Sequence, residues 1–391
     1  VGFESWLDEG VEFTGNSGVW APISGDPELG IVYLPVEDPT GDYYGGDRPG
    51  ANLFSSGLVA LDIKTGERKW HYQFIHHDIW DWDVPSAPLL ADLPNGRKVV
   101  MSVTKQSWVY TFDRETGEPV WPIVERPVPA GDVPGEWYSP TQPFPTRPAA
   151  FDRQGFGEDD LIDFTPELRA MALEAIADFR LSPTIYTPPS LADAPDGTRG
   201  LLSLPSSTGG SNWEGAALDP ETGILYVPSR TQLQVLALAK NPDSDIALSQ
   251  GFGVRVPRIQ GLEVVKPPYG RITAIDMNTG DHLWWVANAD TPDRIKNHAL
   301  LEGVDIPRTT RSGIFVTKTL LLQAEGTGAA GASPIFRAID KTSGEIVGEL
   351  NLPFNQTGLP FTYEHEGKQY IAMFIGGAGN PAELIAYALP D

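Results

Sequence analysis

The sequence has 391 residues, a formal net charge of −24 and 41% hydrophobic residues. This composition is typical of a globular chain with a large core, and the acidity argues against nucleic acid as a partner, which requires a basic surface. Because the chain has no cysteine, disulfides, thiolate metal sites, cysteine nucleophiles and a Cys-x-x-Cys-His haem site are excluded.

An imperfect repeat recurs from the first to the last part of the chain. Each copy is an apolar strand ending in Asp, a short turn closed by Gly, and a second strand that often carries Trp. The copies span residues 24–34, 60–70, 111–121, 217–227, 274–285 and 338–348. The Asp accepts hydrogen bonds from the turn, and the Gly supplies a positive φ. The Trp is expected to pack on the next unit, because such a unit cannot bury its own faces.

The repeat predicts an all-β chain, a β-propeller of four-stranded antiparallel blades, with about five to six blades in this chain. Adjacent copies lie roughly 50 to 65 residues apart, which is the size of one blade with its loops. Another antiparallel repeat architecture is the alternative. We expect residues 1–391 to form one domain.

Insertions interrupt the repeat. Residues 127–198 are interpreted as an inter-blade insertion that begins with an extended, proline-rich stretch. Within it, residues 166–180 predict a helix, with Thr165 as its N-cap and Pro166 at its first position. Residues 241–266 are a second irregular insertion. The last blade is predicted as a hairpin that turns at 366–367, followed by a closing strand.

The densest chemical cluster is HHDIWDWD, residues 76–83, with two His, three Asp and two Trp. Carboxylates packed among tryptophans are suited to general base catalysis or to binding a hard metal ion. The alternative is a rigid aromatic loop whose carboxylates are solvated.

This motif, preceded by SGLVALDIKTGERKWHYQ, resembles the pyrroloquinoline quinone (PQQ)-dependent alcohol and glucose dehydrogenases. The resemblance extends from WAPIS to AYALP and is nearest to the glucose-dehydrogenase-like branch, through PTQPF and KPPYGRITAID. It implies PQQ and Ca²⁺ as cofactors, an alcohol or sugar as substrate, and a quinone or cytochrome as a separate electron acceptor. It also implies a periplasmic or extracellular location. A cofactor-free propeller that acts as a binding or assembly scaffold is the alternative.

The resemblance implies roles for individual residues. Asp81 corresponds to the catalytic base beside the metal, and His77 and Asp78 to residues that shape its loop. The expected cofactor-binding residues are Trp20, which would stack on the quinone, and Lys105, Asn212, Trp213 and Arg311. The expected metal ligands are Asp38, Asp81 and Asp83.

Two departures from the family pattern affect the metal site. Asp38 stands where the family has Asn, and Glu37 is the alternative if the register shifts by one. Asp83 follows the base by two positions, a feature of lanthanide-using relatives, so a lanthanide is an alternative to calcium. The family's full propeller has eight blades, and its N-terminal part also supplies a Glu ligand. The chain opens with Val1, and we expect the upstream blades as a separate segment or chain.

Overall fold

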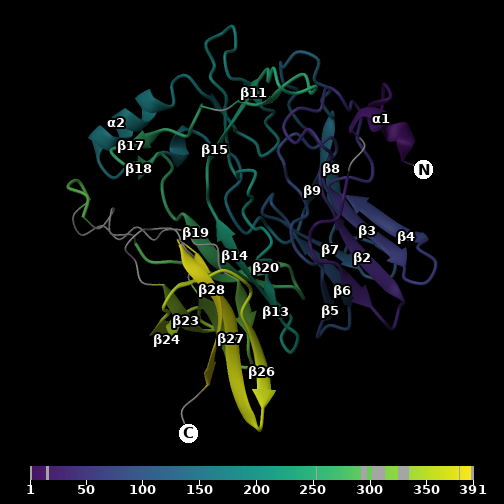
Figure 1. Cartoon of the computed structure of the whole chain (residues 1–391), viewed down its shortest axis with the longest axis vertical. Helices are drawn as coiled ribbons and strands as arrows, with labels where there is room; N and C mark the ends of the chain where they lie inside the picture. The colour runs from purple at the N-terminus through teal and green to yellow at the C-terminus, as the bar shows by residue number, and fades with distance from the viewer. Residues whose placement is uncertain are drawn as a thin grey trace. The chain divides into compact units, whose positions relative to one another are not determined.

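The structure is a computed structural model that divides into two compact units (Figure 1). It describes residues 2–14, 17–251, 253–291, 297–301, 313–324, 334–377 and 379–388. The first unit comprises residues 1–92, 96–213 and 231–266. The second unit comprises residues 93–95, 214–230 and 267–391.

The first unit contains three blade-like sheets. The sheet β1-β2-β3-β4 is formed by Ser24–Asp26, Ile31–Val36, Gly57–Asp62 and Arg68–Gln73. The sheet β5-β6-β7 is formed by Leu89–Asp92, Lys98–Val103 and Val109–Asp113. The sheet β10-β12-β15-β11, with β16 paired to β15, is formed by Arg180–Leu181, Leu201–Ser203, Gln234–Ala239, Ser190–Leu191 and Ser249–Gln250.

Short elements connect these sheets. Two ribbons pair β8 (Ile123–Pro127) with β9 (Thr141–Pro145), and β17 (Arg258–Ile259) with β18 (Leu262–Glu263). The helical elements are η1 (Phe3–Ser5), α1 (Gly10–Thr14), η2 (Glu158–Asp160) and α2 (Pro166–Ala175). None of the helices in the described part of the chain has the length and apolar character needed to cross a membrane.

The second unit contains three antiparallel sheets. The sheet β13-β14-β19-β20 is formed by Ala217–Asp219, Ile224–Arg230, Gly270–Asp276 and Asp281–Ala287. The sheet β21-β22-β23-β24 is formed by Ile314–Val316, Leu320–Ala324, Ile335–Asp340 and Ile346–Asn351. The last is formed by β25 (Asn355–Gln356), β26 (Phe361–His365), β27 (Lys368–Gly377) and β28 (Asn380–Ala388). The six blade-like sheets of the described residues confirm the predicted blade architecture, and the predicted final hairpin is present.

The turn of each repeat forms as its residues predict. Asp62 Oδ1 accepts hydrogen bonds from the backbone N–H groups of Lys64 and Thr65, at 2.9 and 3.0 Å. Gly66 closes this turn with φ +73°, a conformation that suits glycine. The corresponding Asp113 and Asp340 accept equivalent bonds two and three residues ahead.

Two neighbouring sheets of the first unit are linked by a set of contacts that we call the joint. It is formed by Trp70, Gly117, Arg114, Asp26 and Tyr33. The indole of Trp70 lies so close to Gly117 that a Cβ at Gly117 would be 2.6 Å from Trp70 Cδ2. Arg114 Nε pairs with Asp26 Oδ2 at 2.7 Å, and the Tyr33 hydroxyl donates to the Arg114 carbonyl at 2.7 Å. The tryptophan of one repeat therefore packs on the glycine of another, as predicted.

The second unit builds the same joint from equivalent residues. Trp284 lies on Gly344, where a Cβ would be 3.0 Å from Trp284 Cε3. Lys341 Nζ pairs with Asp219 Oδ2 at 2.6 Å, and the Tyr226 hydroxyl donates to the Lys341 carbonyl at 3.0 Å. The two joints differ mainly in the cation, which is Arg in one and Lys in the other.

The predicted helix begins where expected but ends early. Thr165 Oγ1 accepts from the Leu168 N–H at 3.2 Å, and the helix spans Pro166–Ala175. The expectation that it continues to residue 180 is wrong. Arg180 instead begins β10 and pairs with Leu201, so hydrogen bonding to a distant strand replaces the last helical turn.

Candidate functional site

The HHDIWDWD loop connects β4 to β5 and is anchored by its tryptophans. Trp80 and Trp82 are buried and stack with ring centroids 5.3 Å apart. Their indole N–H groups donate to the carbonyls of Thr187 and Ser206, at 2.9 and 3.2 Å. Because both indoles are fixed in the core, Asp81 between them is held in place, at φ +59°.

Asp78 organises the same loop from within. Its carboxylate accepts from the backbone N–H groups of Trp80 and Trp82, at 2.9 and 3.1 Å, and from the Ser56 hydroxyl at 3.1 Å. Burial raises the pKa of Asp78 to about 7. The buried guanidinium of Arg48 donates to the Asp78 carbonyl. These contacts support the expected loop-shaping role.

His77 is fixed by a buried partner that the sequence did not indicate. Its Nδ1 lies 2.8 Å from the Gly50 carbonyl, and its Nε2 lies 2.9 Å from Glu136 Oε1. Both side chains are almost fully buried. His77 therefore connects the loop to two other segments, and both of its ring nitrogens are engaged by them.

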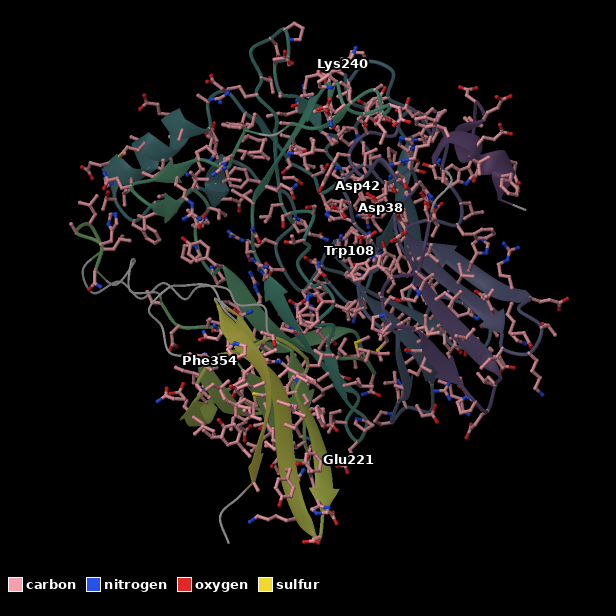
Figure 2. All side chains as sticks on the ribbon, viewed as in Figure 1. Asp38, Asp42, Trp108, Glu221, Lys240 and Phe354 are labelled. Atoms are coloured by element: carbon pink, nitrogen blue, oxygen red, sulfur yellow. The ribbon has the colours of Figure 1, made fainter. Side chains whose placement is uncertain are left out.

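Three carboxylates meet at the end of this loop. Asp38, Asp81 and Asp83 each offer an oxygen, and these oxygens all lie within 4.8 Å of one another. We call these three residues the aspartate cluster. Asp38 follows β2, is 7% exposed and lies among densely packed side chains (Figure 2). Its backbone N–H donates to Asp83 Oδ1 at 3.0 Å. Glu37, the alternative ligand, instead accepts from the Gly18 N–H at 2.7 Å.

Lys105 lies against this cluster. It occupies the turn between β6 and β7 and is 4% exposed. Its Nζ donates to Asp81 Oδ1 at 2.9 Å, to the Asp81 carbonyl at 2.7 Å and to Asp83 Oδ2 at 2.9 Å. All three ammonium protons are thus directed at the chain's own oxygens, and a quinone oxygen would have to replace one of these acceptors.

The electrostatics of the cluster separate its members. Burial raises the pKa of Asp38 well above its usual range, with a further contribution from the neighbouring Asp83 carboxylate. Burial also raises the pKa of Asp81 to about 6, against the opposing effect of Lys105. Burial acts in the same direction on Asp83, but hydrogen bonds from Asp38 and the Lys105 ammonium outweigh it and lower the Asp83 pKa. With three carboxyl groups and a single ammonium group, the cluster carries excess negative charge.

The cluster fits a hard cation. Carboxylate oxygens are the ligands that Ca²⁺ prefers, and a divalent ion would balance the excess charge. Asp38 Oδ2 is buried without a hydrogen-bond partner, which is costly for an oxygen unless another group compensates it. A cation would supply that partner.

Tyr43 is a member of the site that sequence reasoning missed. Its hydroxyl donates to Asp81 Oδ2 at 2.8 Å. It belongs to the loop that follows Asp38, and no spacing relates it to residue 81. The only available signal was its nearness in sequence to an expected ligand.

The expected cofactor-binding residues are partly brought to this region. Trp20 exposes 49% of its surface, which is compatible with a stacking platform. Asn212 is engaged locally, since its Nδ2 donates to the Thr208 carbonyl at 2.8 Å and its Oδ1 accepts from the Trp213 N–H at 2.8 Å. Trp213 is 36% exposed. Arg311 lies outside the described residues.

Gly209 and Gly210, which precede Asn212, pack against the turn that carries Lys105. A Cβ at Gly209 would be 2.6 Å from Lys105 Cα, and the Gly210 N–H donates to the Lys105 carbonyl at 2.9 Å. These glycines therefore let their loop pack directly on the Lys105 turn. This packing brings the Asn212 loop beside the aspartate cluster.

Comparison with known proteins gives one consistent family. Residues 3–371 match the PQQ family model described as glucose/ethanol/alcohol dehydrogenase, beta-propeller domain. The glycerol dehydrogenase large subunit of Gluconobacter oxydans is 32% identical over 96% of this chain and 55% of its own length. Quinoprotein glucose dehydrogenase A of Acinetobacter calcoaceticus is 30% identical over 98% of this chain and 50% of its own length.

Solved structures agree on the fold. The quinohemoprotein alcohol dehydrogenase of Comamonas testosteroni has a TM-score of 0.62 at 19% identity, covering 96% of this chain and 47% of that one. A europium-containing methanol dehydrogenase has a TM-score of 0.62 at 20% identity, covering 95% and 53%. The chain spans about half the length of the relatives it matches.

Proposed function

We propose, because the chain belongs to the PQQ family of glucose, ethanol and alcohol dehydrogenase β-propeller domains, that it takes part in oxidising an alcohol or sugar hydroxyl. The observation that carries this proposal is the buried aspartate cluster with Lys105 directed into it. Electrons would pass to a separate acceptor, a quinone or a cytochrome. The proposed location is the periplasm or the extracellular space.

The aspartate cluster is the proposed metal site. Asp38, Asp81 and Asp83 would hold Ca²⁺. Because Asp83 lies two positions after the proposed base, a lanthanide is also a candidate. The geometry favours Asp38 over Glu37, because the Glu37 carboxylate is engaged by Gly18. Asp83, whose pKa is held low, is the member best suited to stay ionised as a permanent anionic ligand.

Asp81 is the proposed general base. With its pKa raised to about 6 by burial, it is ionised at neutral pH yet basic enough to accept a hydroxyl proton, as such catalysis requires.

Bound PQQ would supply the two-electron acceptor. Lys105, held against Asp81 and Asp83, would stabilise negative charge that develops on a nearby oxygen. Trp20 would provide an aromatic face, with Asn212, Trp213 and Arg311 as further proposed contacts.

The outer face of the β1–β4 sheet is the proposed contact for a further blade. Gly66 occupies the same position in its repeat as Gly117, yet no atom lies within 4 Å of a Cβ built there. Ile63 beside it is 61% exposed. In the second unit the corresponding Met277 is fully buried, and Asn95 contacts the adjacent Asn278. The same surface is thus covered in one unit and open in the other.

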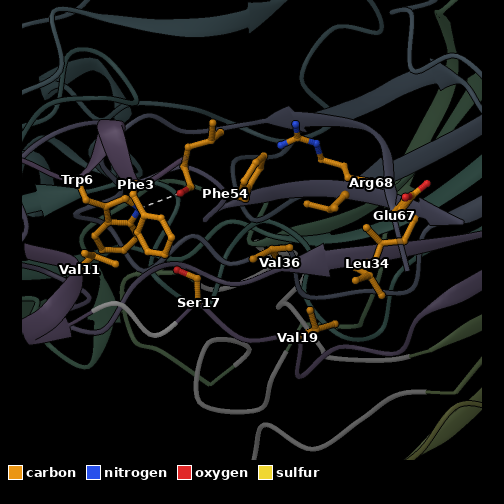
Figure 3. Close-up of a pocket in the computed structure, with 13 residues that line it drawn as sticks. Phe3, Trp6, Val11, Ser17, Val19, Leu34, Val36, Phe54, Glu67 and Arg68 are labelled. Carbon is orange, nitrogen blue, oxygen red and sulfur yellow. Dashed lines mark hydrogen bonds between the residues drawn. The ribbon is translucent and has the colours of Figure 1, made fainter. Parts of the chain in front are cut away.

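An apolar groove of about 700 Å³ lies on this part of the first unit (Figure 3). Aliphatic and aromatic side chains line most of it, and Trp6 is fixed there by a hydrogen bond from its indole to the Leu53 carbonyl at 2.8 Å. The occupant we propose is an upstream blade of the same propeller whose tryptophan covers Gly66. The chain offers no such tryptophan from its own last sheets, since no Trp follows Trp285.

The test is a titration of the purified chain with PQQ plus Ca²⁺, and separately with PQQ plus La³⁺. Quinone absorbance reports binding, and reduction of a dye acceptor with glucose or glycerol reports turnover. Saturable binding with metal-dependent turnover supports the enzyme. Binding only by a form that carries upstream blades would make this chain one part of the active ring. Absence of binding by either form would favour the cofactor-free scaffold.

A further inference from the structure

Tyr43 contacts the proposed base on the side opposite Lys105. Its hydroxyl donates to Asp81 Oδ2 at 2.8 Å, while Lys105 Nζ donates to Oδ1 at 2.9 Å. Each carboxylate oxygen therefore has its own donor, from two different loops. Two such bonds fix the plane of a carboxylate, and a hydrogen bond to a charged acceptor is stronger than one between neutral groups.

The Tyr43 hydroxyl is committed to donating. A tyrosine hydroxyl has an ordinary pKa of about 10, so it carries its proton throughout the neutral range. A hydroxyl has one proton and can also accept. Here that one proton is directed at Asp81 Oδ2.

The segment that carries Tyr43 is itself held on both sides. Upstream, the fully buried Arg48 donates to the Gly41 carbonyl at 3.0 Å. Downstream, the Gly45 N–H donates to Glu136 Oε2 at 2.7 Å. The hydroxyl is therefore presented from a fixed backbone, and its position does not depend on Asp81 alone.

We infer that Tyr43 is a positioning residue for the proposed dehydrogenation: its hydroxyl fixes the Asp81 carboxylate so that the base faces the substrate hydroxyl in one orientation. The inference rests on the proposed function. The Tyr43 hydroxyl bonds the Asp81 carboxylate, so its proposed effect is exerted through Asp81. A base displaced by about 1 Å can lose about 100-fold in rate.

The test compares Tyr43→Phe with Tyr44→Phe. The first variant removes only the hydroxyl that bonds Asp81. The second removes the neighbouring hydroxyl, which donates to the Pro134 carbonyl at 3.2 Å instead of to an aspartate. Dye-linked turnover of the holo form is measured with glycerol and glucose, and crystal structures of both variants are determined without added cofactor.

We expect Tyr43→Phe to lower kcat by about 10- to 100-fold with KM within about twofold, and Tyr44→Phe to stay near wild type. We also expect the Asp81 carboxylate to be turned in the Tyr43→Phe crystal structure. Unchanged kcat, or equal losses in both variants, would overturn the inference. If neither this chain nor a form that carries upstream blades shows turnover, the proposed function fails, and the crystal structures alone decide: an unmoved Asp81 carboxylate refutes the positioning role.

Discussion

Replacing Lys341 by Met tests the joint between the sheets of the second unit. The variant leaves the Asp219 carboxylate in place without the ammonium that contacts it at 2.6 Å, where the lysine and aspartate side chains are only 8% and 5% exposed. Removing one partner of a buried ion pair costs about 3 to 5 kcal/mol. Asp219 retains hydrogen bonds from Thr222 Oγ1 and the Glu221 N–H, so we expect a loss near the low end, about 3 kcal/mol.

The loss should depend on pH in one direction. Burial tends to raise the pKa of Asp219, but hydrogen bonds from Lys341 and Thr222 outweigh it and lower the pKa. A carboxylate with a lowered pKa contributes stability that is complete above its unfolded pKa of about 4 and is lost as pH falls through the folded value. The loss of unfolding free energy in Lys341→Met, relative to wild type, is therefore complete at pH 7 and becomes smaller as acid protonates Asp219.

Equilibrium unfolding in urea, followed by circular dichroism at pH 7 and at about pH 3, below the unfolded pKa of the carboxyl, measures this difference. Lys318→Met is the matched control, because Lys318 is an exposed lysine in the turn between β21 and β22. We expect the control to stay within about 0.5 kcal/mol of wild type. If Lys341→Met were no less stable than Lys318→Met, or equally deficient at both pH values, the ion pair would not be what stabilises the joint.

Four further outcomes are expected. Gly117→Ala should destabilise the protein by at least about 2 kcal/mol more than Gly66→Ala in urea unfolding, since both glycines have similar positive φ but only Gly117 lies against Trp70. Asp81→Asn should abolish dye-linked turnover with an unchanged circular dichroism spectrum, since the side-chain volume is preserved. Trp20→Ala should weaken PQQ binding more than Ca²⁺ binding, both measured by titration. The Ca²⁺ affinity of the aspartate cluster, measured calorimetrically, should rise from pH 5 to pH 8, since protons compete with the cation for a carboxyl whose pKa is raised to about 6.

The repeats predicted the sheets because their turns are local. Asp62 and Gly66 lie four residues apart and make the bonds that close the turn themselves, so no distant residue is needed to interpret them. The end of the helix could not be predicted in the same way. Arg180 leaves the helix because its backbone pairs with a strand around Leu201, and this choice depends on a segment about 20 residues away.

The candidate site, too, could be predicted from the sequence only in part. The resemblance indicated Asp38, Asp81, Asp83 and Lys105, and the structure brings all four together. The residues that fix the loop around them were missed. Glu136 reaches His77 across 59 positions, and such a contact leaves no trace in local spacing. Supporting residues of this kind are identified only once the fold brings distant segments together, whereas the proposed site residues belong to a sequence motif.

One signal for the joints was nevertheless present in the sequence. The residue after each turn Asp follows the order Pro, Ile, Arg in the first three copies and Pro, Met, Lys in the last three. In both series the basic residue of the third copy pairs with the Asp of the first. The repeat is therefore a series of three turns used twice, and only the third carries the cation. A variant that adds a cation at the middle turn, Ile63→Arg, should leave the Arg114–Asp26 pair and the stability of the first unit unchanged in urea unfolding, because Ile63 is exposed and lies outside that pair.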